Sequence, residues 1–193
     1  MNNVMLDPLP SDWMGYAIDS DFRIGIQIHQ ILEDRELSKT ERIMHAGRLL
    51  FPGAILPPEE QAEALEWYMT AWNHDRHKRS KDTVRVLDYD IDQWRLYSAF
   101  RSQYGINLNT IDSLHYWEFM GLLTTLDECA FTRVIDIRVR KKNSKMSKEE
   151  VKALEESKAI YALEQAEQEE TPEQREEREN AIKRFEELRK ANS

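Results

Sequence analysis

The chain has 193 residues, a formal net charge of −9 and a single cysteine, Cys129. This length fits one domain with an appendage or two small domains, and the lone cysteine excludes an internal disulfide. The acidic balance argues against a protein that binds nucleic acid with its whole surface. No apolar run approaches the ~20 residues that a membrane span needs, and the first residues lack the basic segment of a signal peptide. We therefore expect a soluble protein of the cytoplasm.

The beginning of the chain divides into an arm and a first helix. Residues 1–17 are expected to form a flexible arm, because two prolines interrupt any continuous helix. Trp13 and Tyr16 are candidates to anchor the end of this arm to the body. From Ser20 the apolar spacing predicts a helix, although residues 22–28 alternate in a way that also fits a strand.

Three further helices are marked by the residues at their starts. Ser38 followed by Glu41 predicts a capping box, in which two side chains satisfy the free backbone N–H groups of the first turn. Ser147 followed by Glu150 predicts a second capping box. Pro57-Pro58 opens another helix, since proline is well suited to the first helical turn. These signals indicate a helical protein.

The stretch at residues 88–126 holds two of the five tryptophans and four of the seven tyrosines. It predicts a hairpin of two helices, the first beginning near Asp90 and ending at Gly105, where a left-handed residue closes the helix. The second helix has Thr110 or Asp112 as its predicted cap. The rings of the first helix recur at three- and four-residue steps and should share one face: Trp94, Tyr97, Phe100 and Tyr104.

Several candidate sites fail on their own chemistry. Asp88, Asp90 and Asp92 imitate the start of a calcium loop, but Gln93 occupies the position where the loop needs glycine. His74 and His77 lack the further ligands that zinc requires. Acidic neighbours of Cys129 oppose the thiolate that a nucleophile needs. We therefore expect no metal, no cofactor and no catalytic residues, and hence no enzyme.

A helix predicted at about residues 130–140 runs into the most basic stretch of the chain. Its cations and those that follow are Arg133, Arg138, Arg140, Lys141, Lys142, Lys145 and Lys148. They indicate either a surface that docks an acidic partner or nucleic acid, or a solvated helix end whose cations complement the helix dipole. The second interpretation is favoured.

Four motifs point to a family: DYDID, QYGINL, IDSLHYWEFMGLL and SKAIYAL. With them, the run from residue 86 to 163 resembles the bacteriophage protein-fifteen family, and the opening DFRI–QI looks like that family's start. The resemblance implies a gene between those of the major tail protein and the tape-measure protein. Proteins from that position are taken to be tail assembly chaperones, so the implied partner is the tape-measure protein. The family motif implies no catalytic residue and no cofactor.

The sequence thus predicts an all-α, multi-helix bundle-like domain at residues 18–163, followed by a projecting polar helix at 164–193. The predicted function is that of a non-enzymatic tail assembly chaperone in the host cell cytoplasm. The alternatives are a structural tail or head-completion component that stays in the virion, and a nucleic-acid-binding regulator that uses the basic run. Self-association is left open, and neither a membrane nor nucleic acid is expected among the partners. The residues predicted to bind protein are Trp94, Tyr97, Trp117, Phe119, Arg138, Arg140, Lys141 and Lys142.

Overall fold

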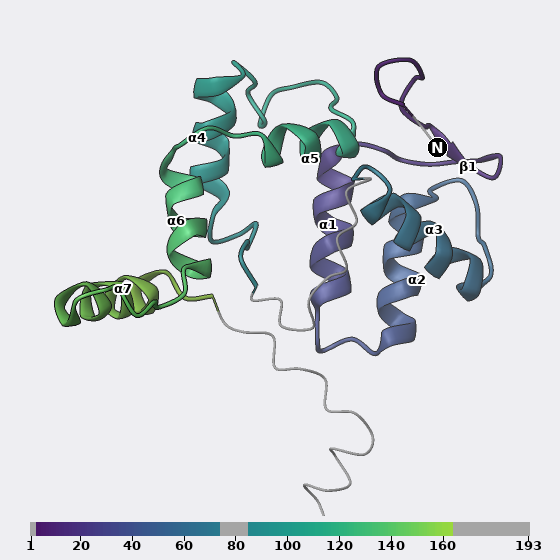
Figure 1. Ribbon diagram of the computed structural model, residues 1–193. Helices are drawn as coiled ribbons and strands as arrows, with labels where there is room; N and C mark the ends of the chain where they lie inside the picture. The colour runs from purple at the N-terminus through teal and green to yellow at the C-terminus, as the bar shows by residue number, and fades with distance from the viewer. Residues whose placement is uncertain (1–2, 74–84, 164–193) are drawn as a thin grey trace, which may run out of the picture. The chain divides into compact units, whose positions relative to one another are not determined.

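The computed structural model describes residues 3–73 and 85–163, and helices make up most of this part of the chain (Figure 1). The described residues contain seven helices and two very short strands, so the predicted all-α fold class is confirmed apart from the strands. The elements are β1 (Asp12–Trp13), β2 (Tyr16–Ala17), α1 (Phe22–Glu33), α2 (Lys39–Leu50), α3 (Pro58–Thr70), α4 (Gln93–Gln103), α5 (Tyr116–Thr124), α6 (Ala130–Val139) and α7 (Lys148–Tyr161). The extension predicted at residues 164–193 lies outside the described residues.

Helix α1 shows how the local sequence fixes a helix start. The side chain of Asp21 accepts a hydrogen bond from the backbone N–H of Arg23 at 2.9 Å and so caps the helix. The buried residues Phe22, Gly25 and Ile28 then follow at three-residue steps on one face. The predicted helix is confirmed, and the alternative strand does not form.

Helices α2, α3 and α7 begin where the sequence predicts. At α2, Ser38 and Glu41 form a complete capping box. At α7, Ser147 and Glu150 form a second one. Pro58 occupies the first turn of α3, where its missing N–H leaves no bond unmade. Each of these starts satisfies or removes backbone donors that have no partner within the helix.

Helix α1 packs against both α2 and α5, and Gly25 permits a very close contact with α5. A Cβ atom on Gly25 would lie 2.1 Å from the Cδ2 atom of Tyr116, the first residue of α5. The Tyr116 ring in turn stacks on Tyr68 of α3, with ring centroids 5.1 Å apart. Glycine at this position therefore lets three helices share one aromatic contact.

The first helix of the aromatic hairpin starts later than predicted. Helix α4 begins at Gln93, because the Asp88 carboxylate accepts hydrogen bonds from the backbone N–H groups of Asp90 and Ile91 and so forms a turn. At the other end, Gly105 has a φ of +71°, which is the left-handed conformation expected for a closing glycine. The predicted end of the helix is confirmed and its predicted start is wrong by a few residues.

Helix α5 begins at Tyr116, so the predicted caps at Thr110 and Asp112 are wrong. Two backbone hydrogen bonds to the residues at the start of α1 hold this part of the chain extended. The Tyr116 N–H donates to the Ser20 carbonyl oxygen at 2.7 Å, and the Phe22 N–H donates to the Leu114 carbonyl oxygen at 2.8 Å. A helix that started earlier would lose both bonds. His115 caps α5 instead, because its ring Nδ1 accepts a backbone N–H of the first turn at 3.0 Å.

A two-stranded hairpin in the N-terminal arm was not predicted. Strands β1 and β2 are antiparallel, with Trp13 opposite Tyr16. The turn residues Met14 and Gly15 both have positive φ, 51° and 85°, as a tight hairpin turn requires. Trp13 is buried, and its ring lies 6.2 Å from the Phe51 ring, between centroids. The predicted anchoring of the arm by this tryptophan is therefore confirmed.

Candidate functional site

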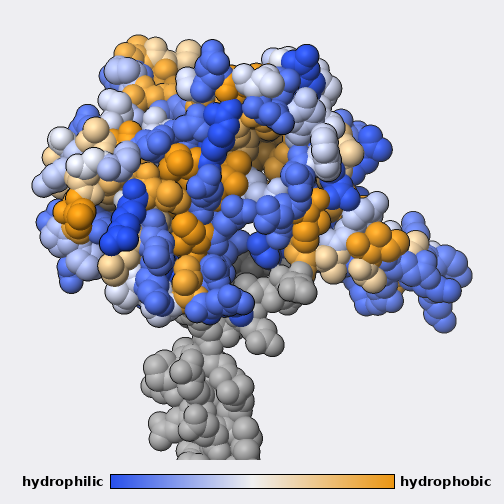
Figure 2. Space-filling view, turned by 180° about the vertical axis from the view of Figure 1, so that it is seen from behind, coloured by the Kyte–Doolittle hydropathy of each residue, from blue (hydrophilic) through white to orange (hydrophobic). Residues whose placement is uncertain are grey.

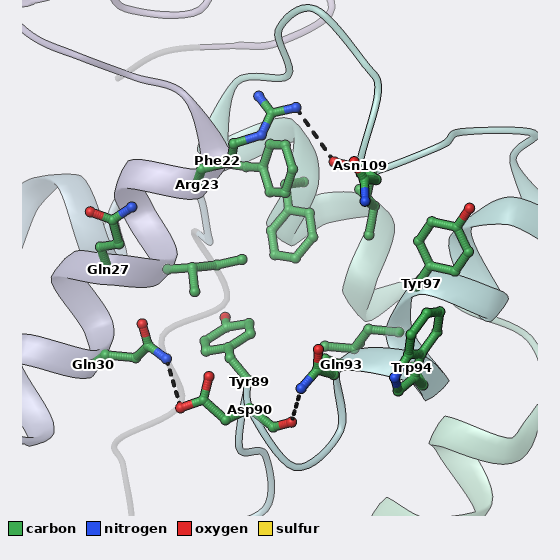
Figure 3. A pocket seen from close by; sticks show the side chains of 14 residues that line it. Phe22, Arg23, Gln27, Gln30, Tyr89, Asp90, Gln93, Trp94, Tyr97 and Asn109 are labelled. Atoms are coloured by element: carbon green, nitrogen blue, oxygen red, sulfur yellow. Dashed lines mark hydrogen bonds between the residues drawn. The ribbon is translucent and has the colours of Figure 1, made fainter.

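A cleft of about 530 Å³ opens between α1 and α4, and its lining includes the turn before α4 and the loop after it (Figure 3). Side chains of α1 lie on one side of the cleft and those of α4 on the other. Figure 2 shows the molecule from behind, where hydrophobic residues lie in a hollow between hydrophilic ones. The volume lies within the range of roughly 300–1,000 Å³ that is usual for ligand-binding pockets.

The floor of the cleft is aromatic. Phe22 of α1 stacks on Phe119 of α5, which in turn stacks on Phe100 of α4, and the centroids are 5.1 Å apart in both pairs. Tyr89 and Leu96 add further buried apolar lining. Burial raises the pKa of Tyr89, so its hydroxyl stays protonated at neutral pH. The floor is therefore uncharged and suited to an apolar side chain.

The α4 side of the cleft carries an uncovered tryptophan. Trp94 is 72% exposed, and its ring meets the half-buried Tyr97 edge to face at a centroid distance of 5.8 Å. Ile91, in the turn before α4, is also exposed. Tryptophan and tyrosine are enriched among the residues that carry most of the energy at protein interfaces. This side therefore has the composition of a protein-binding surface.

Polar groups surround the mouth of the cleft. Gln30 of α1 donates a hydrogen bond to the Asp90 carboxylate at 3.0 Å, and Gln93 of α4 donates to the Asp90 carbonyl oxygen at 2.8 Å. Both bonds are drawn in Figure 3. Arg23 donates to the carboxylate of Asp21 and, at 2.6 Å, to a backbone carbonyl oxygen of the loop before α5. The Gln30 and Gln93 bonds connect the two sides of the cleft through Asp90 in the turn before α4, whereas the Arg23 bond connects α1 to the loop before α5.

Of the four aromatic residues predicted to bind protein, three line this cleft and one does not. Trp94 and Tyr97 form its α4 side, and Phe119, which is 1% exposed, lies in its floor. Trp117 is buried elsewhere, where its indole N–H donates to the carbonyl oxygen of Tyr68 at 2.7 Å. Trp117 is therefore removed from the predicted set of protein-binding residues. Its large ring lies on the inner face of a helix and packs in the core. Only Trp94 and Tyr97 are left where a partner can reach much of the ring.

Arg138 also lies in the interior. Its side chain is 4% exposed and donates hydrogen bonds to both carboxylate oxygens of Asp92, at 2.6 and 3.1 Å. It donates further bonds to the carbonyl oxygens of Val86 and Tyr161, at 2.9 and 2.8 Å. A guanidinium with four internal acceptors holds the fold together, so the predicted role of Arg138 in partner binding is corrected.

The sequence contained one signal for this buried pair. Phe131, Val134 and Arg138 lie on the same buried face of α6, so the arginine occupies an apolar position of the helix. An arginine at such a position requires a buried acceptor. Arg138 was instead grouped with the neighbouring basic residues, and Asp92 was considered only as part of an incomplete calcium loop.

The remaining predicted basic residues are on the surface. Arg140 pairs with Asp136, and Lys142 pairs with Glu155 on α7. Lys141 is exposed and forms no ion pair within the described part of the chain. Exposed pairs of this kind contribute little to stability, and they neutralise part of the positive charge. The interpretation as a solvated helix end therefore stays favoured for these three cations.

The candidate metal ligands do not converge in the described residues. No group of three or more His, Cys, Asp or Glu side chains that could hold a metal ion is found among them. Asp92 is paired with Arg138, while Asp88 pairs with Arg85 at 3.0 Å, so two of the three calcium-loop candidates have other partners. The predicted pair His74 and His77 lies outside the described residues.

Taken together, these observations define a helical protein with an open aromatic cleft whose mouth is polar. In its described residues no helix has the length and apolar character needed to cross a membrane. A family model described as Bacteriophage Gp15 protein matches residues 5–163. The chain therefore belongs to this bacteriophage family, which implies a phage structural or assembly protein. No curated protein and no solved structure matches the chain.

Proposed function

We propose that this phage protein is a tail assembly chaperone that binds the tape-measure protein in the host cytoplasm before and during tail-tube polymerisation and then leaves. Membership of the family over residues 5–163 supports an assembly role. The resemblance to the protein-fifteen family, whose genes lie beside the tape-measure gene, supports this choice of partner.

The observation that carries the proposal is the uncovered α4 side of the cleft. Trp94 is exposed above a floor that includes Phe22 and Phe119. A long chain with apolar segments aggregates when these face water, so its chaperone has to cover them temporarily. An open aromatic cleft provides apolar contact area for this purpose. The net charge of −9 keeps the resulting complex soluble.

Co-expression with the tape-measure protein tests the proposal. We expect the wild-type protein to raise the soluble yield of the tape-measure protein, and Trp94→Ala to lose most of that effect. Because Trp94 is exposed, this change should leave the fold intact. Ile160→Ala, which shortens another exposed apolar side chain outside the cleft, is the matched control. An unchanged soluble yield with the wild-type protein would reject the chaperone function.

Mass spectrometry of purified virions separates the proposal from a structural role. A chaperone that leaves should be absent from mature particles. Stoichiometric presence in the particles would instead assign the chain to the structural tail or head-completion components.

A further inference from the structure

The mouth of the cleft is lined by side-chain amides. They belong to Gln27, Gln30, Gln93 and Asn109. Within the described residues, the side chains of Gln27 and Asn109 make no hydrogen bond. Gln30 and Gln93 each use one side-chain N–H on Asp90, and their side-chain carbonyl oxygens accept no hydrogen bond from any residue that the structure describes. The mouth therefore keeps both donors and acceptors for a ligand.

Asp90 gives this mouth an unmatched negative charge. Its side chain is exposed, and in the described part of the chain no lysine, arginine or histidine forms an ion pair with it. Arg23 is the one cation among the described lining residues, and its guanidinium is already paired with Asp21 at 3.1 Å. A ligand that carries a cation can therefore form an ion pair with Asp90, whose carboxylate accepts a hydrogen bond from Gln30 but has no cationic partner in the described part of the chain.

These groups fit a peptide in an extended conformation better than a helix. The backbone N–H and C=O groups of an extended segment are free to bond with the amides, whereas those of a helix are bonded to each other.

We propose that the cleft binds an extended segment of the partner that carries one large apolar or aromatic side chain and, two or four residues away, a lysine or arginine. The apolar side chain contacts Phe22, Tyr89 and Trp94, and the cation pairs with Asp90. Side chains two residues apart in an extended chain point to the same face, so both can reach the cleft. This inference rests on the proposed function, since the partner is the tape-measure protein.

The exposed apolar turn of this protein's own arm is a poorer ligand. Val4, Met5 and Leu6 are exposed there, but Asp7 follows them and residues 3–12 contain no cation. Insertion of this turn into the cleft of a second copy would bring Asp7 toward Asp90, and like charges repel. The charges therefore favour a partner with a basic residue over a second copy.

Peptide binding tests the inference. Short overlapping peptides that span the tape-measure protein would be titrated against the full-length chain, with fluorescence anisotropy as the readout. The peptides that bind most tightly should share the apolar side chain and the cation at the stated spacing. We expect Asp90→Asn to weaken binding by roughly three- to tenfold and to reduce its salt dependence. Trp94→Ala should weaken binding by roughly tenfold or more. Glu63→Gln, which removes an exposed acid outside the cleft, should leave it unchanged.

The outcomes separate this inference from the proposed function. If peptides bind wild type, Asp90→Asn and Trp94→Ala equally, or if only the full-length tape-measure protein binds, the inference fails and the chaperone function stands. A gain of helical circular dichroism on binding would also overturn it. A wild-type dimer that Trp94→Ala converts to a monomer would identify a second copy as the ligand. If neither the peptides nor the full-length tape-measure protein binds wild type, the proposed function itself is rejected.

Discussion

Arg138 of α6 and Asp92, the residue just before α4, form a buried bidentate ion pair, with N–O distances of 2.6 and 3.1 Å. The same guanidinium donates to the carbonyl oxygen of Tyr161, the last residue of α7. The pair therefore connects three helices. Asp92 directly precedes α4, so the pair also anchors the turn of that helix that carries Gln93 and Trp94 of the cleft.

Replacing Arg138 should destabilise the fold strongly. In Arg138→Met the carboxylate of Asp92 loses its main cation, although Arg95 still lies 2.9 Å away. Removing one partner from a buried ion pair lowers the free energy of unfolding by about 3–5 kcal/mol. Because Arg95 still pairs with Asp92, we expect a decrease near the lower end of this range. Urea denaturation followed by tryptophan fluorescence measures it.

Two further variants control for this result. Arg140→Met removes an exposed arginine close to the same helix end and should change the free energy of unfolding by less than about 0.5 kcal/mol. The double change Asp92→Leu with Arg138→Met removes both buried charges and should recover part of the loss. If Arg138→Met costs no more than Arg140→Met, the pair does not hold the helices together.

Gly25→Ala should also destabilise the protein, because the new Cβ would lie 2.1 Å from the Tyr116 ring. Forcing a methyl group into a packed contact costs roughly 1–3 kcal/mol. Gly121→Ala is the matched control, since a methyl group on this helical glycine would meet no described atom within 4 Å apart from its chain neighbours and the backbone of its own helix. There alanine should stabilise by about 0.5–1 kcal/mol. Thermal unfolding of both variants tests the contrast, and equal shifts in the same direction would contradict it.

His115 should make stability depend on pH. Its Nδ1 accepts the backbone N–H of Trp117, so the neutral ring carries its proton on Nε2, which donates to the Pro10 carbonyl oxygen. Burial lowers the pKa of His115 below 6.5, against smaller opposing effects of the Pro10 bond and Glu118. The unfolded state therefore binds more protons below about pH 6.5. The stability that this residue contributes is complete above that pH and declines as the pH falls toward and through the lowered pKa.

Chemical denaturation at pH 7 and pH 5 measures this effect. His115→Asn keeps a side chain that caps helices well but cannot titrate. The free energy of unfolding should fall less between the two pH values in His115→Asn than in wild type. An identical fall in the two proteins would show that the His115 cap is not what titrates.

The elements that the sequence predicted correctly depend on residues close together in the chain. The capping boxes at Ser38 and Ser147 each join residues three apart, and Gly105 closes α4 through its own φ. The start of α5 could not be predicted in this way. It depends on backbone bonds to the residues at the start of α1, which lie far away in the sequence, and on His115, a residue type that seldom caps helices.

The candidate site was predicted only in part, because it too depends on residues that lie far apart in the sequence. Helical spacing identified Trp94, Tyr97 and Phe119 as apolar positions but not what covers each one. Phe119 is covered by Phe22 and Phe100, which come from two other helices, whereas Trp94 contacts Tyr97 of its own helix and stays 72% exposed. The amides at the mouth come from α1, α4 and the loop before α5, so no local pattern joins them.

Site-specific photo-crosslinking tests most directly whether the cleft binds the tape-measure protein. A photoreactive phenylalanine analogue would replace Trp94 in one sample and Ile55, which is 90% exposed outside the cleft, in another. Each variant would be irradiated in cells that also make the tape-measure protein. We predict an adduct with the tape-measure protein from position 94 and none from position 55. No adduct from position 94, or equal adducts from both positions, would contradict this account.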